Sequence, residues 1–346
     1  MRVLIGLSGG FDSAYAVKLL LEEGHEVAAA VIVMHDYTDV ERAKGVARIF
    51  DIPLFEIDAR ELFDKVVKEN FATEYSRGRT PNPCIICNPL VKFRALADLA
   101  REKGYDAIAT GHYARIVDYV DTDGRSRRTL ATALDAAKDQ TYMLYRLPSD
   151  ILDMLRLPLS SSVKKELRSS VTDTPFASID AKDSQEICFL PDGDYPSFVT
   201  ERIGMSKGGN FVTEDGSIIA PHKGIIHYTV GQRKGLGVSL GERAFVTDID
   251  GESGNITLST SPRLATRMLL SDVHTPAIEA WEGREEDLSV KVRYAAPRVD
   301  ARVRFLSEGR AEVLLRQPQR SVTKGQSVVF YNKDILIGGG IIEGVE

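Results

Sequence analysis

The chain begins with a short apolar run that leads into a glycine-rich turn, Val3-Leu4-Ile5-Gly6-Leu7-Ser8-Gly9-Gly10-Phe11-Asp12-Ser13. The apolar run predicts a buried strand, and the residues that follow to Glu23 have the apolar spacing of a helix. Two adjacent glycines let a backbone approach an anion closely, and the first N–H groups of a helix favour negative charge. This strand–loop–helix unit therefore predicts a phosphate-binding loop.

The polar residues of the loop add chemistry to this shape. Ser8 and Ser13 offer hydroxyl donors, and Asp12 could hold a Mg²⁺ ion that bridges phosphates. No lysine follows the glycines, so the Walker pattern is absent and γ-phosphoryl transfer is not indicated. The structural alternative is a plain glycine turn between a strand and a helix.

The segments after the loop alternate between strand and helix. Continuous apolar runs are typical of buried parallel strands, and their alternation with helices predicts a doubly wound α/β sheet with the loop at the carboxyl edge of its first strand. The expected strands are 27–34, 53–57 and 106–110, and the expected helices are 12–23, 40–50 and 61–75.

Length and charge limit the remaining possibilities. A chain of 346 residues is long enough for two or three domains. No apolar run approaches the length of a membrane span and no signal segment precedes the first strand, so we expect a cytoplasmic protein with no membrane partner. The net charge of −6 disfavours nucleic acid as a partner of the whole chain, but residues 263–346 carry 13 Lys and Arg against 12 Asp and Glu.

The three cysteines are too few and too scattered for a disulfide framework, so we expect reduced thiols with a function. Cys84 and Cys87 lie in a proline-pinned loop ahead of a helix expected from Pro89 to Gly104, where the helix dipole would favour thiolates. Cys188 lies in a polar-to-apolar stretch, 182–189. Small buried side chains are the structural alternative. His112 follows the strand 106–110 and is expected to contact a ligand at the sheet edge.

The second half of the chain becomes rich in β-structure. A hairpin is expected at 117–132, with Asp123-Gly124 at its turn, and helices are expected at 138–155, at 160–170 and from Asp194 to Ile203. Beyond Gly204, turns and alternation indicate strands, and about five of them between Leu288 and Ile342 predict a small barrel. The expected domains are 1–203, 204–262 and 263–346.

Several motifs together resemble one family, the tRNA-specific 2-thiouridylases. The resemblance runs nearly from end to end, and its longest part is the glycine-rich and basic stretch at 228–237. The other motifs are Ser8-Gly9-Gly10-Phe11-Asp12-Ser13, Gly78 to Asn88, Thr110-Gly111-His112-Tyr113, Lys138-Asp139-Gln140, Cys188-Phe189, Val292-Arg293-Tyr294, Gly325-Gln326 and Gly338-Gly339-Gly340.

The resemblance implies a reaction. In that family ATP adenylates the C2 oxygen of the wobble uridine of tRNA, and a cysteine-borne sulfur then displaces AMP to leave 2-thiouridine. Here Cys188 would carry the persulfide, and Cys87 would form a disulfide with it or free the sulfur. The resemblance assigns ATP to Gly6, Leu7, Ser8, Gly9, Gly10, Phe11, Asp12, Ser13, Met34 and Gly111, the target base to Asn82, Pro83 and Cys84, and the rest of the tRNA to His112, Lys138, Asp139, Gln140, Arg293, Tyr294 and Gln326.

Two residues depart from the family pattern. Phe11 replaces a usual valine, which we expect to alter only packing under the loop. Cys84 stands where many members carry an aspartate that can act as general acid or base toward the uridine. Cys84, Cys87 and Cys188 could instead hold a [4Fe–4S] cluster whose free iron binds sulfur, with zinc and His112 as the weaker alternative.

Two other functions remain open on the sequence alone. An adenylating synthetase that transfers nitrogen would share the loop, but the cysteines and the C-terminal region oppose it. A non-catalytic RNA-binding or sulfur-carrier protein would bind nucleotide without turnover, and conversion of ATP to AMP with tRNA present would separate it from the enzyme. A thiolating enzyme would also need a sulfur donor, either a persulfide-carrying protein or sulfide.

Overall fold

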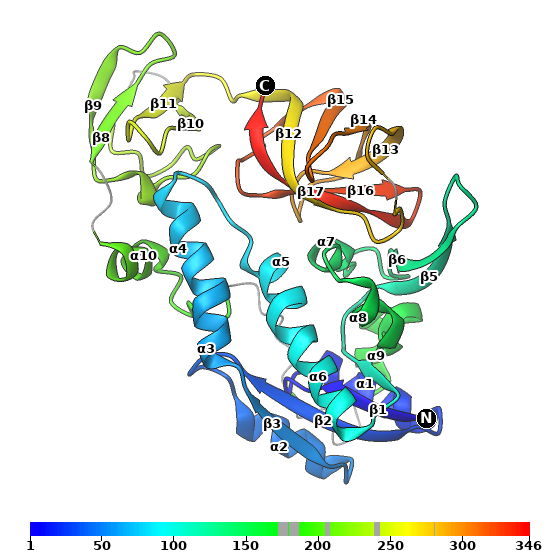
Figure 1. Cartoon of the computed structure of the whole chain (residues 1–346). Coiled ribbons are helices and arrows are strands. Elements are labelled where there is room, and N and C mark those ends of the chain that lie inside the picture. Colours follow the sequence, from blue (N-terminus) through cyan, green and yellow to red (C-terminus); the bar gives the residue numbers. More distant parts are fainter. Residues whose placement is uncertain (172–178, 180–186, 205–207, 239–242, 280) are drawn as a thin grey trace.

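The computed structural model describes residues 1–171, 179, 187–204, 208–238, 243–279 and 281–346. These residues form a five-stranded sheet, a four-stranded sheet and an eight-stranded sheet that contains a closed barrel. Figure 1 shows the barrel beside long helices that lead down to the first sheet. Within the described residues, no helix is long and apolar enough to cross a membrane. The expected polar stretch 182–186 lies outside the described residues.

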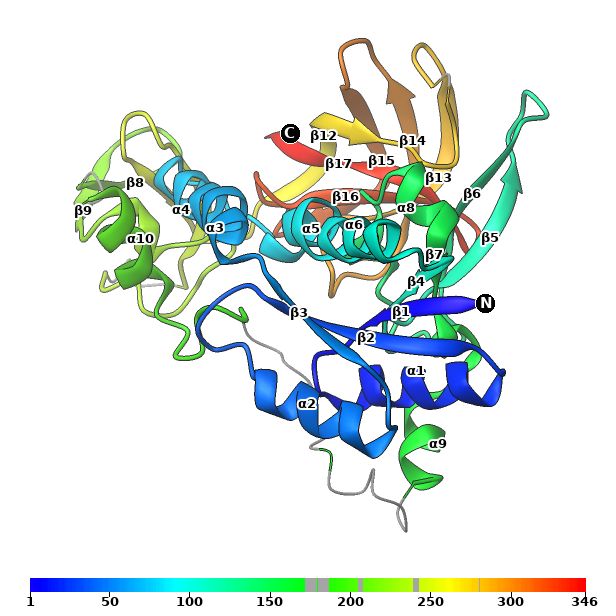
Figure 2. The same cartoon turned by 60° about the horizontal axis from the view of Figure 1, so that its bottom comes forward.

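The first sheet is parallel throughout and has the strand order β3-β2-β1-β4-β7. Helices α1 (Phe11–Glu22) and α2 (Val40–Ile49) cover one face, and α6 (Phe93–Lys103) covers the other (Figure 2). The doubly wound sheet predicted from the sequence is thus confirmed. Its strands are β1 (Arg2–Gly6), β2 (Glu26–Val33), β3 (Leu54–Asp58), β4 (Ala107–Ala109) and β7 (Leu155–Arg156).

The two faces of this sheet bury alternate residues of the same strand. Val3 and Ile5 share a core with Val17 of α1, whereas Leu4 between them packs into the core that contains Leu96 of α6. All of these side chains are at most 1% exposed. Strands buried on both faces need continuous apolar runs, which is why the sequence showed no alternation here.

Two long helical segments on the α6 side contain π-helical turns. The first joins α3 (Arg60–Phe63), η1 (Asp64–Lys68) and α4 (Glu69–Ser76), and the second joins α5 (Pro83–Cys87), η2 (Asn88–Lys92) and α6. The prediction that the second helix starts at Pro89 is therefore wrong. The Asn82 side chain caps the helix by accepting from Cys84 N, and a π turn accommodates the missing N–H of Pro89.

The barrel consists of six strands closed by pairing of β12 with both β15 and β17. The predicted hairpin, β5 (Arg115–Val120) and β6 (Ser126–Ala131), extends the barrel sheet through the pairing of Ala131 with Ile335. The first half of the chain therefore contributes strands to the C-terminal sheet. The barrel strands are β12 (Leu264–His274), β13 (Glu285–Lys291), β14 (Val299–Phe305), β15 (Ala311–Arg320), β16 (Ser327–Asn332) and β17 (Ile335–Val345).

Shorter elements connect the two main sheets. The predicted helix ending at Ile203 is α10 (Tyr195–Ile203), which Asp194 caps by accepting from Ser197 N. The connecting helices are α7 (Thr141–Leu144), α8 (Ser149–Met154), η3 (Pro158–Ser161), α9 (Lys164–Ser169) and η5 (Ile225–His227). The strands of the middle sheet are β8 (Gly209–Val212), β9 (Ile218–His222), β10 (Phe245–Ile249) and β11 (Ile256–Ser259).

Candidate functional site

The loop between β1 and α1 has the form that the sequence predicts for a phosphate cradle. The hydroxyl of Ser13 accepts from Ser8 N at 3.3 Å and donates to Gly10 O at 2.9 Å. The Ser8 hydroxyl lies 3.1 Å from that of Ser13. These contacts close the loop over the first turn of α1, whose free N–H groups point toward the sheet edge.

Two glycines let other segments approach this loop. Gly9 has a φ of +77°, and a Cβ there would lie 2.7 Å from Cγ of Arg42 in α2. A Cβ on Gly111, directly after β4, would lie 2.7 Å from Ser13 N. The ends of β1 and β4 therefore meet at one point of the sheet edge, where ligands of doubly wound sheets bind.

Asp12 is engaged by two side chains from distant parts of the chain. Its Oδ1 accepts from the Tyr113 hydroxyl at 2.9 Å, and its Oδ2 lies 2.6 Å from Lys164 Nζ. Lys164 is only 6% exposed, and its ammonium also lies 5.9 Å from the Tyr113 ring. Lys164 could not be found from the sequence, because no local pattern places α9 next to a loop 152 residues earlier.

A basic pocket of about 550 Å³ lies next to this ion pair. The guanidinium of Arg168 stands 6.0 Å over the ring of Phe11, so the residue that departs from the family pattern contacts the wall of this pocket. Four cationic side chains against one carboxylate favour an anionic ligand here. The lining residues are Asp135, Ala137, Lys138, Val163, Lys164, Lys165, Arg168 and Ser169.

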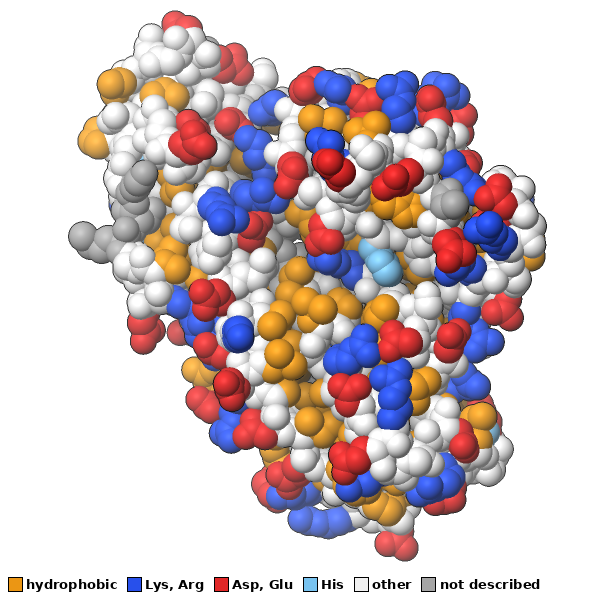
Figure 3. All heavy atoms as spheres, in the orientation of Figure 1, with side chains coloured by type: hydrophobic (Ala, Val, Ile, Leu, Met, Phe, Trp, Pro, Cys, Tyr) orange, Lys and Arg blue, Asp and Glu red, His pale blue; other side chains and the backbone are white. Residues whose placement is uncertain are grey.

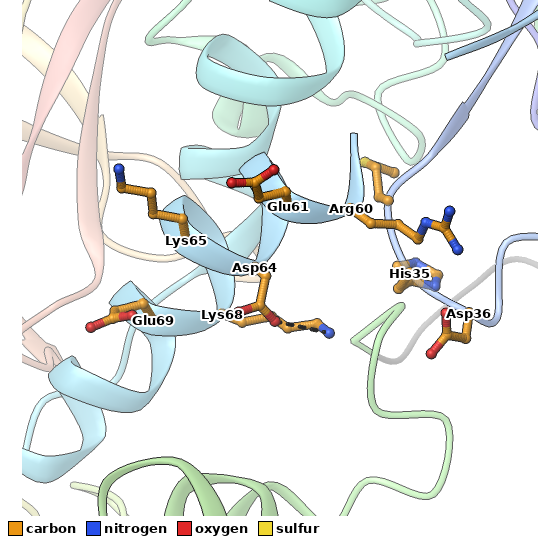
Figure 4. A pocket seen from close by; sticks show the side chains of 9 residues that line it. His35, Asp36, Arg60, Glu61, Asp64, Lys65, Lys68 and Glu69 are labelled. Atoms are coloured by element: carbon orange, nitrogen blue, oxygen red, sulfur yellow. Dashed lines mark ion pairs between the residues drawn. The ribbon is translucent and has the colours of Figure 1, made fainter. Parts of the chain in front are cut away.

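A second pocket, of about 490 Å³, opens beside Met34 at the carboxyl end of β2 (Figure 4). His35 is 8% exposed, and its Nδ1 is buried without a hydrogen-bond partner among the described residues. Burial, together with the charge of Lys68, lowers the pKa of His35. The pocket walls carry charges of both signs, and its other lining residues are Asp36, Arg60, Glu61, Asp64, Lys65, Lys68 and Glu69.

The structure separates the two cysteines of the proline-pinned loop. Cys84 is exposed, whereas Cys87 is 7% exposed and its Sγ lies 3.6 Å from Sδ of Met34. Burial raises the pKa of the Cys87 thiol to about 12, with the positive charge of Lys92 acting weakly in the other direction. The expectation that the helix terminus makes Cys87 a thiolate is therefore wrong for this state, because desolvation outweighs the dipole.

Cys188 completes the set of three thiols. Its side chain is classed as exposed, yet partial desolvation by the surrounding protein raises its pKa, and the Cys84 side chain adds to this effect. Cys84 and Cys188 also contribute to the raised pKa of Cys87, as smaller causes than desolvation. Phe189 anchors this segment by packing edge-on against Phe63, with ring centroids 5.6 Å apart.

The thiols do not form a ready-made metal site. Within the described part of the chain, which includes all three cysteines and His112, no three His, Cys, Asp or Glu side chains are arranged to hold a metal ion. The described residues therefore form no site for a single ion such as zinc, and the [4Fe–4S] cluster stays a prediction from the sequence.

His112 lies beyond β4 as predicted, but it is an uncharged group. Its Nδ1 is 2.9 Å from the Thr110 hydroxyl, and its ring packs 5.4 Å from that of Phe93. Burial of the ring, with the charge of Lys92 as a smaller cause, lowers the pKa of His112 to about 3. Any contact with tRNA would thus be made by a neutral imidazole across the physiological pH range.

The three residues Lys138, Asp139 and Gln140 have different roles in the structure. Lys138 lines the basic pocket. Asp139 is buried, accepting from Ala133 N at 3.2 Å and from the Thr141 hydroxyl at 2.7 Å. Gln140 Oε1 accepts from Tyr113 N at 2.9 Å, which fixes the residue that contacts Asp12. Two of the three side chains assigned to tRNA by the resemblance therefore hold the fold together.

The barrel residues assigned to tRNA lie at the junction with the helices. Arg293 and Tyr294 are exposed, and the Tyr294 ring lies 6.1 Å from that of Tyr142 in α7. Gln326 instead donates from Nε2 to the carbonyl oxygen of Thr80 at 2.7 Å. The structure thus brings Gln326 to the cysteine-bearing loop rather than to an open surface.

The arginines of the barrel strands are mostly paired with acids. Arg302 and Arg316 both donate to Asp287, and Arg304 donates to Glu312. Paired surface charges attract phosphate less than single ones, so these arginines do not form a uniform basic face. On the face shown in Figure 3, apolar side chains gather over α5 and α6 with charges of both signs around them.

The arrangement defines a nucleotide-binding α/β protein with a thiol-bearing loop at its ligand edge. Three family models cover the chain in the same order as its sheets: a tRNA methyl transferase HUP domain at residues 1–192, a tRNA methyl transferase PRC-barrel domain at 196–260 and an aminomethyltransferase beta-barrel domain at 267–342.

Named relatives match the whole length. The tRNA-specific 2-thiouridylase MnmA of Acetivibrio thermocellus is 39% identical over 359 residues, covering 99% of both chains. That of Carboxydothermus hydrogenoformans is 39% identical over 359 residues, covering 99% of this chain and 97% of its own. The chain belongs to the MnmA family of tRNA-specific 2-thiouridylases.

Proposed function

We propose that this protein is an ATP-dependent tRNA sulfurtransferase that converts the C2 carbonyl of the wobble uridine to a thiocarbonyl. The observation that carries the proposal is that the loop without a Walker lysine and the pocket beside Met34 follow the paired strands β1 and β2, and that Cys87 Sγ lies 3.6 Å from Met34 Sδ at this edge. The relatives' names supply the substrate class, tRNA. The domain boundaries 1–203, 204–262 and 263–346 and the cytoplasmic location stay predictions.

The first step is adenylation. The loop from Gly6 to Ser13 holds the phosphates of ATP, and the pocket beside Met34 receives part of the nucleotide. The uridine O2 attacks the α-phosphorus, and pyrophosphate leaves with the β and γ phosphates. Asp12 would hold a Mg²⁺ ion, which usually takes one or two carboxylates and otherwise phosphate and water oxygens, and which would supply charge neutralisation at the phosphates.

The second step is sulfur transfer. A persulfide-carrying donor protein first transfers its outer sulfur atom to the Cys188 thiolate and is itself left as a thiol. That sulfur attacks C2 and AMP leaves with the former O2, after which the Cys87 thiolate attacks Sγ of Cys188. The S–S bond breaks, 2-thiouridine is released, and the resulting Cys87–Cys188 disulfide requires a thiol reductant for the next cycle.

The sulfur-transfer step requires Cys87 to react as a thiolate. Since its thiol is buried with a pKa of about 12, substrate binding must change its surroundings before it can act as a thiolate. We propose Asn82, Pro83 and exposed Cys84 as the residues nearest the target base, with Arg293 and Tyr294 contacting the tRNA. The synthetase and carrier alternatives remain without a structural observation that favours them.

Lys164 should matter for the first step. Replacing Lys164 with methionine removes the ammonium that contacts Asp12 Oδ2 while keeping the length of the buried stem. We expect tRNA-dependent AMP formation to fall about 100-fold, because a preorganised cation beside the phosphates is lost. Labelled ATP in single-turnover assays measures this.

Lys165 provides the matched control, since it lines the same pocket but is exposed. Lys165→Met should change the rate of AMP formation by no more than about threefold. Equal effects of the two substitutions would show that only the general charge of the pocket counts.

The proposed function is tested by nucleoside analysis. Bulk tRNA from cells lacking the gene should contain no 2-thiouridine at the wobble position, and the complementing gene should restore it. Unchanged 2-thiouridine, in a genome without a second such gene, would reject the proposal.

A further inference from the structure

The segment 77–82, which precedes the exposed Cys84, is held from two sides by the rest of the chain. On one side lies the turn after β10 of the middle sheet, and on the other lies the barrel loop 323–326 that precedes β16. We name this contact the loop clamp and define it by Arg77 to Thr80, Ile249 to Gly251 and Lys324 to Gln326.

On the middle-sheet side of the clamp, the segment around Gly78 and the turn around Gly251 pack directly against each other. Gly78 has a φ of +71°, and a Cβ there would lie 2.6 Å from Cγ2 of Ile249. A Cβ on Gly251 would lie 2.4 Å from the carbonyl oxygen of Arg77. Both glycines are therefore needed for the backbones to approach this closely.

The barrel side is a pair of hydrogen bonds to one residue. Thr80 N donates to the carbonyl oxygen of Lys324 at 2.9 Å, and Thr80 O accepts from Gln326 Nε2 at 2.7 Å. Gly325 lies between these two partners with a φ of +89°, and a Cβ there would lie 3.0 Å from Thr80 N. Both backbone polar groups of Thr80 are thus satisfied by the barrel.

The clamped segment lies immediately before helix α5, which carries Cys84 and Cys87. Asn82 follows Thr80 by two residues, and its side chain caps the helix at Cys84 N and donates to Met143 Sδ at 3.4 Å. A shift of Thr80 would therefore move the cap that sets the position of Cys84. Displacements of about 1 Å at a reacting group can cost about 100-fold in rate.

We infer that Gln326 is a positioning residue, which acts on the reaction by holding Thr80 and thereby the base-facing loop, and that the barrel and the middle sheet set the geometry of the thiols. This inference rests on the proposed function for its kinetic consequence. It differs from a direct contact between Gln326 and tRNA, because its effect exists in the free protein.

The test compares Gln326→Leu, which removes the donor but keeps the size, with Gln317→Leu, an exposed glutamine on β15 of the same barrel. Hydrogen exchange of residues 76–88 in the free protein should rise about fivefold in Gln326→Leu, as expected for one lost hydrogen bond. The tRNA Kd should stay within about twofold, and the single-turnover thiolation rate should fall about tenfold or more. Gln317→Leu should match the wild type in all three.

A second variant tests the clamp from the opposite side, where no tRNA contact is assigned. Gly251→Ala should also raise exchange at residues 76–88 and speed alkylation of the protein at Cys84. If Gln326→Leu leaves exchange at 76–88 unchanged, the inference is overturned, whatever happens to tRNA affinity. Exchange needs neither tRNA nor activity, so its result stands apart from a failure of the proposed function.

Discussion

Replacing Asp12 with alanine should abolish formation of AMP and pyrophosphate from ATP in the presence of tRNA, with a loss of about 1,000-fold or more. The carboxylate is the acidic group at the phosphate loop, and its loss removes the proposed metal ligand and the ion pair with the buried Lys164. ATP labelled at the α and γ phosphates measures the products. Release of ADP by the wild-type protein would contradict the account of the loop.

Tyr113→Phe is the matched control for this prediction. It removes one hydrogen bond to Asp12 Oδ1 and leaves the ring in its buried place, where Tyr113 is 2% exposed. We expect AMP formation to fall about 10- to 100-fold, which corresponds to about 1.5–3 kcal/mol for one hydrogen bond to a charged group. A loss as large as that of Asp12→Ala would show that orientation of the carboxylate, rather than its charge, limits the reaction.

Replacing Cys188 or Cys87 with serine should reduce tRNA thiolation below detection, whereas Cys84→Ser should only slow it. Cys188 carries the sulfur and Cys87 releases it, so neither step has a substitute among the three cysteines of the chain. Adenylation should survive all three substitutions, because the proposed adenylation step uses Asp12 and Lys164 and no thiol. Single-turnover formation of 2-thiouridine and of AMP, measured together, separates the two steps.

Purification without oxygen decides whether a cluster takes part. The persulfide route uses only the thiols of Cys87 and Cys188 and a sulfur donor, so we expect full thiolation activity in protein that contains no iron. The wild type should form a Cys87–Cys188 disulfide during turnover without a reductant, detectable by peptide mass. The persulfide route would be contradicted if the active protein contained iron and sulfide in equal amounts, and if each cysteine substitution removed both the iron and the activity.

The sequence predicted the parts of the fold that depend on local periodicity. The apolar runs of β1 and β2, the capped helix α10 and the hairpin β5–β6 all occur where their patterns indicate. Each of these signals lies within about ten residues, and the physical cause, burial on one or both faces, acts at every position of the element. The phosphate loop was found for the same reason, since its glycines and hydroxyls are adjacent in sequence.

The sequence could not predict contacts that depend on the packing of distant segments. The pairs Lys164 with Asp12 and Gln326 with Thr80 join residues 152 and 246 positions apart. Cys87 lies against Met34 in a helix that starts at Pro83 and not at Pro89. The Asn82 side chain caps the helix at this earlier position. The raised pKa of Cys87 was missed because desolvation is a property of the packed site and not of the motif.

The same limit explains the barrel arginines. Arg302 and Arg304 alternate along strand β14. The acid that pairs with both Arg302 and Arg316, Asp287, comes from strand β13. Strand pairing therefore decides how much positive charge is available to RNA. Tyr142 and Thr129 in the first half of the chain also donate hydrogen bonds to barrel carbonyl oxygens, so removing the barrel would disturb the first domain as well.

The most direct test of the account is a reconstituted reaction. Protein purified without oxygen and loaded with sulfur should be mixed with unmodified tRNA, ATP and Mg²⁺, and both products should be counted in one turnover. We predict one 2-thiouridine at the wobble position for each AMP formed, with no AMP in the absence of tRNA. Thiolation without AMP, or AMP formed at the same rate without tRNA, would contradict the claim that this protein activates the uridine by adenylation before it transfers sulfur.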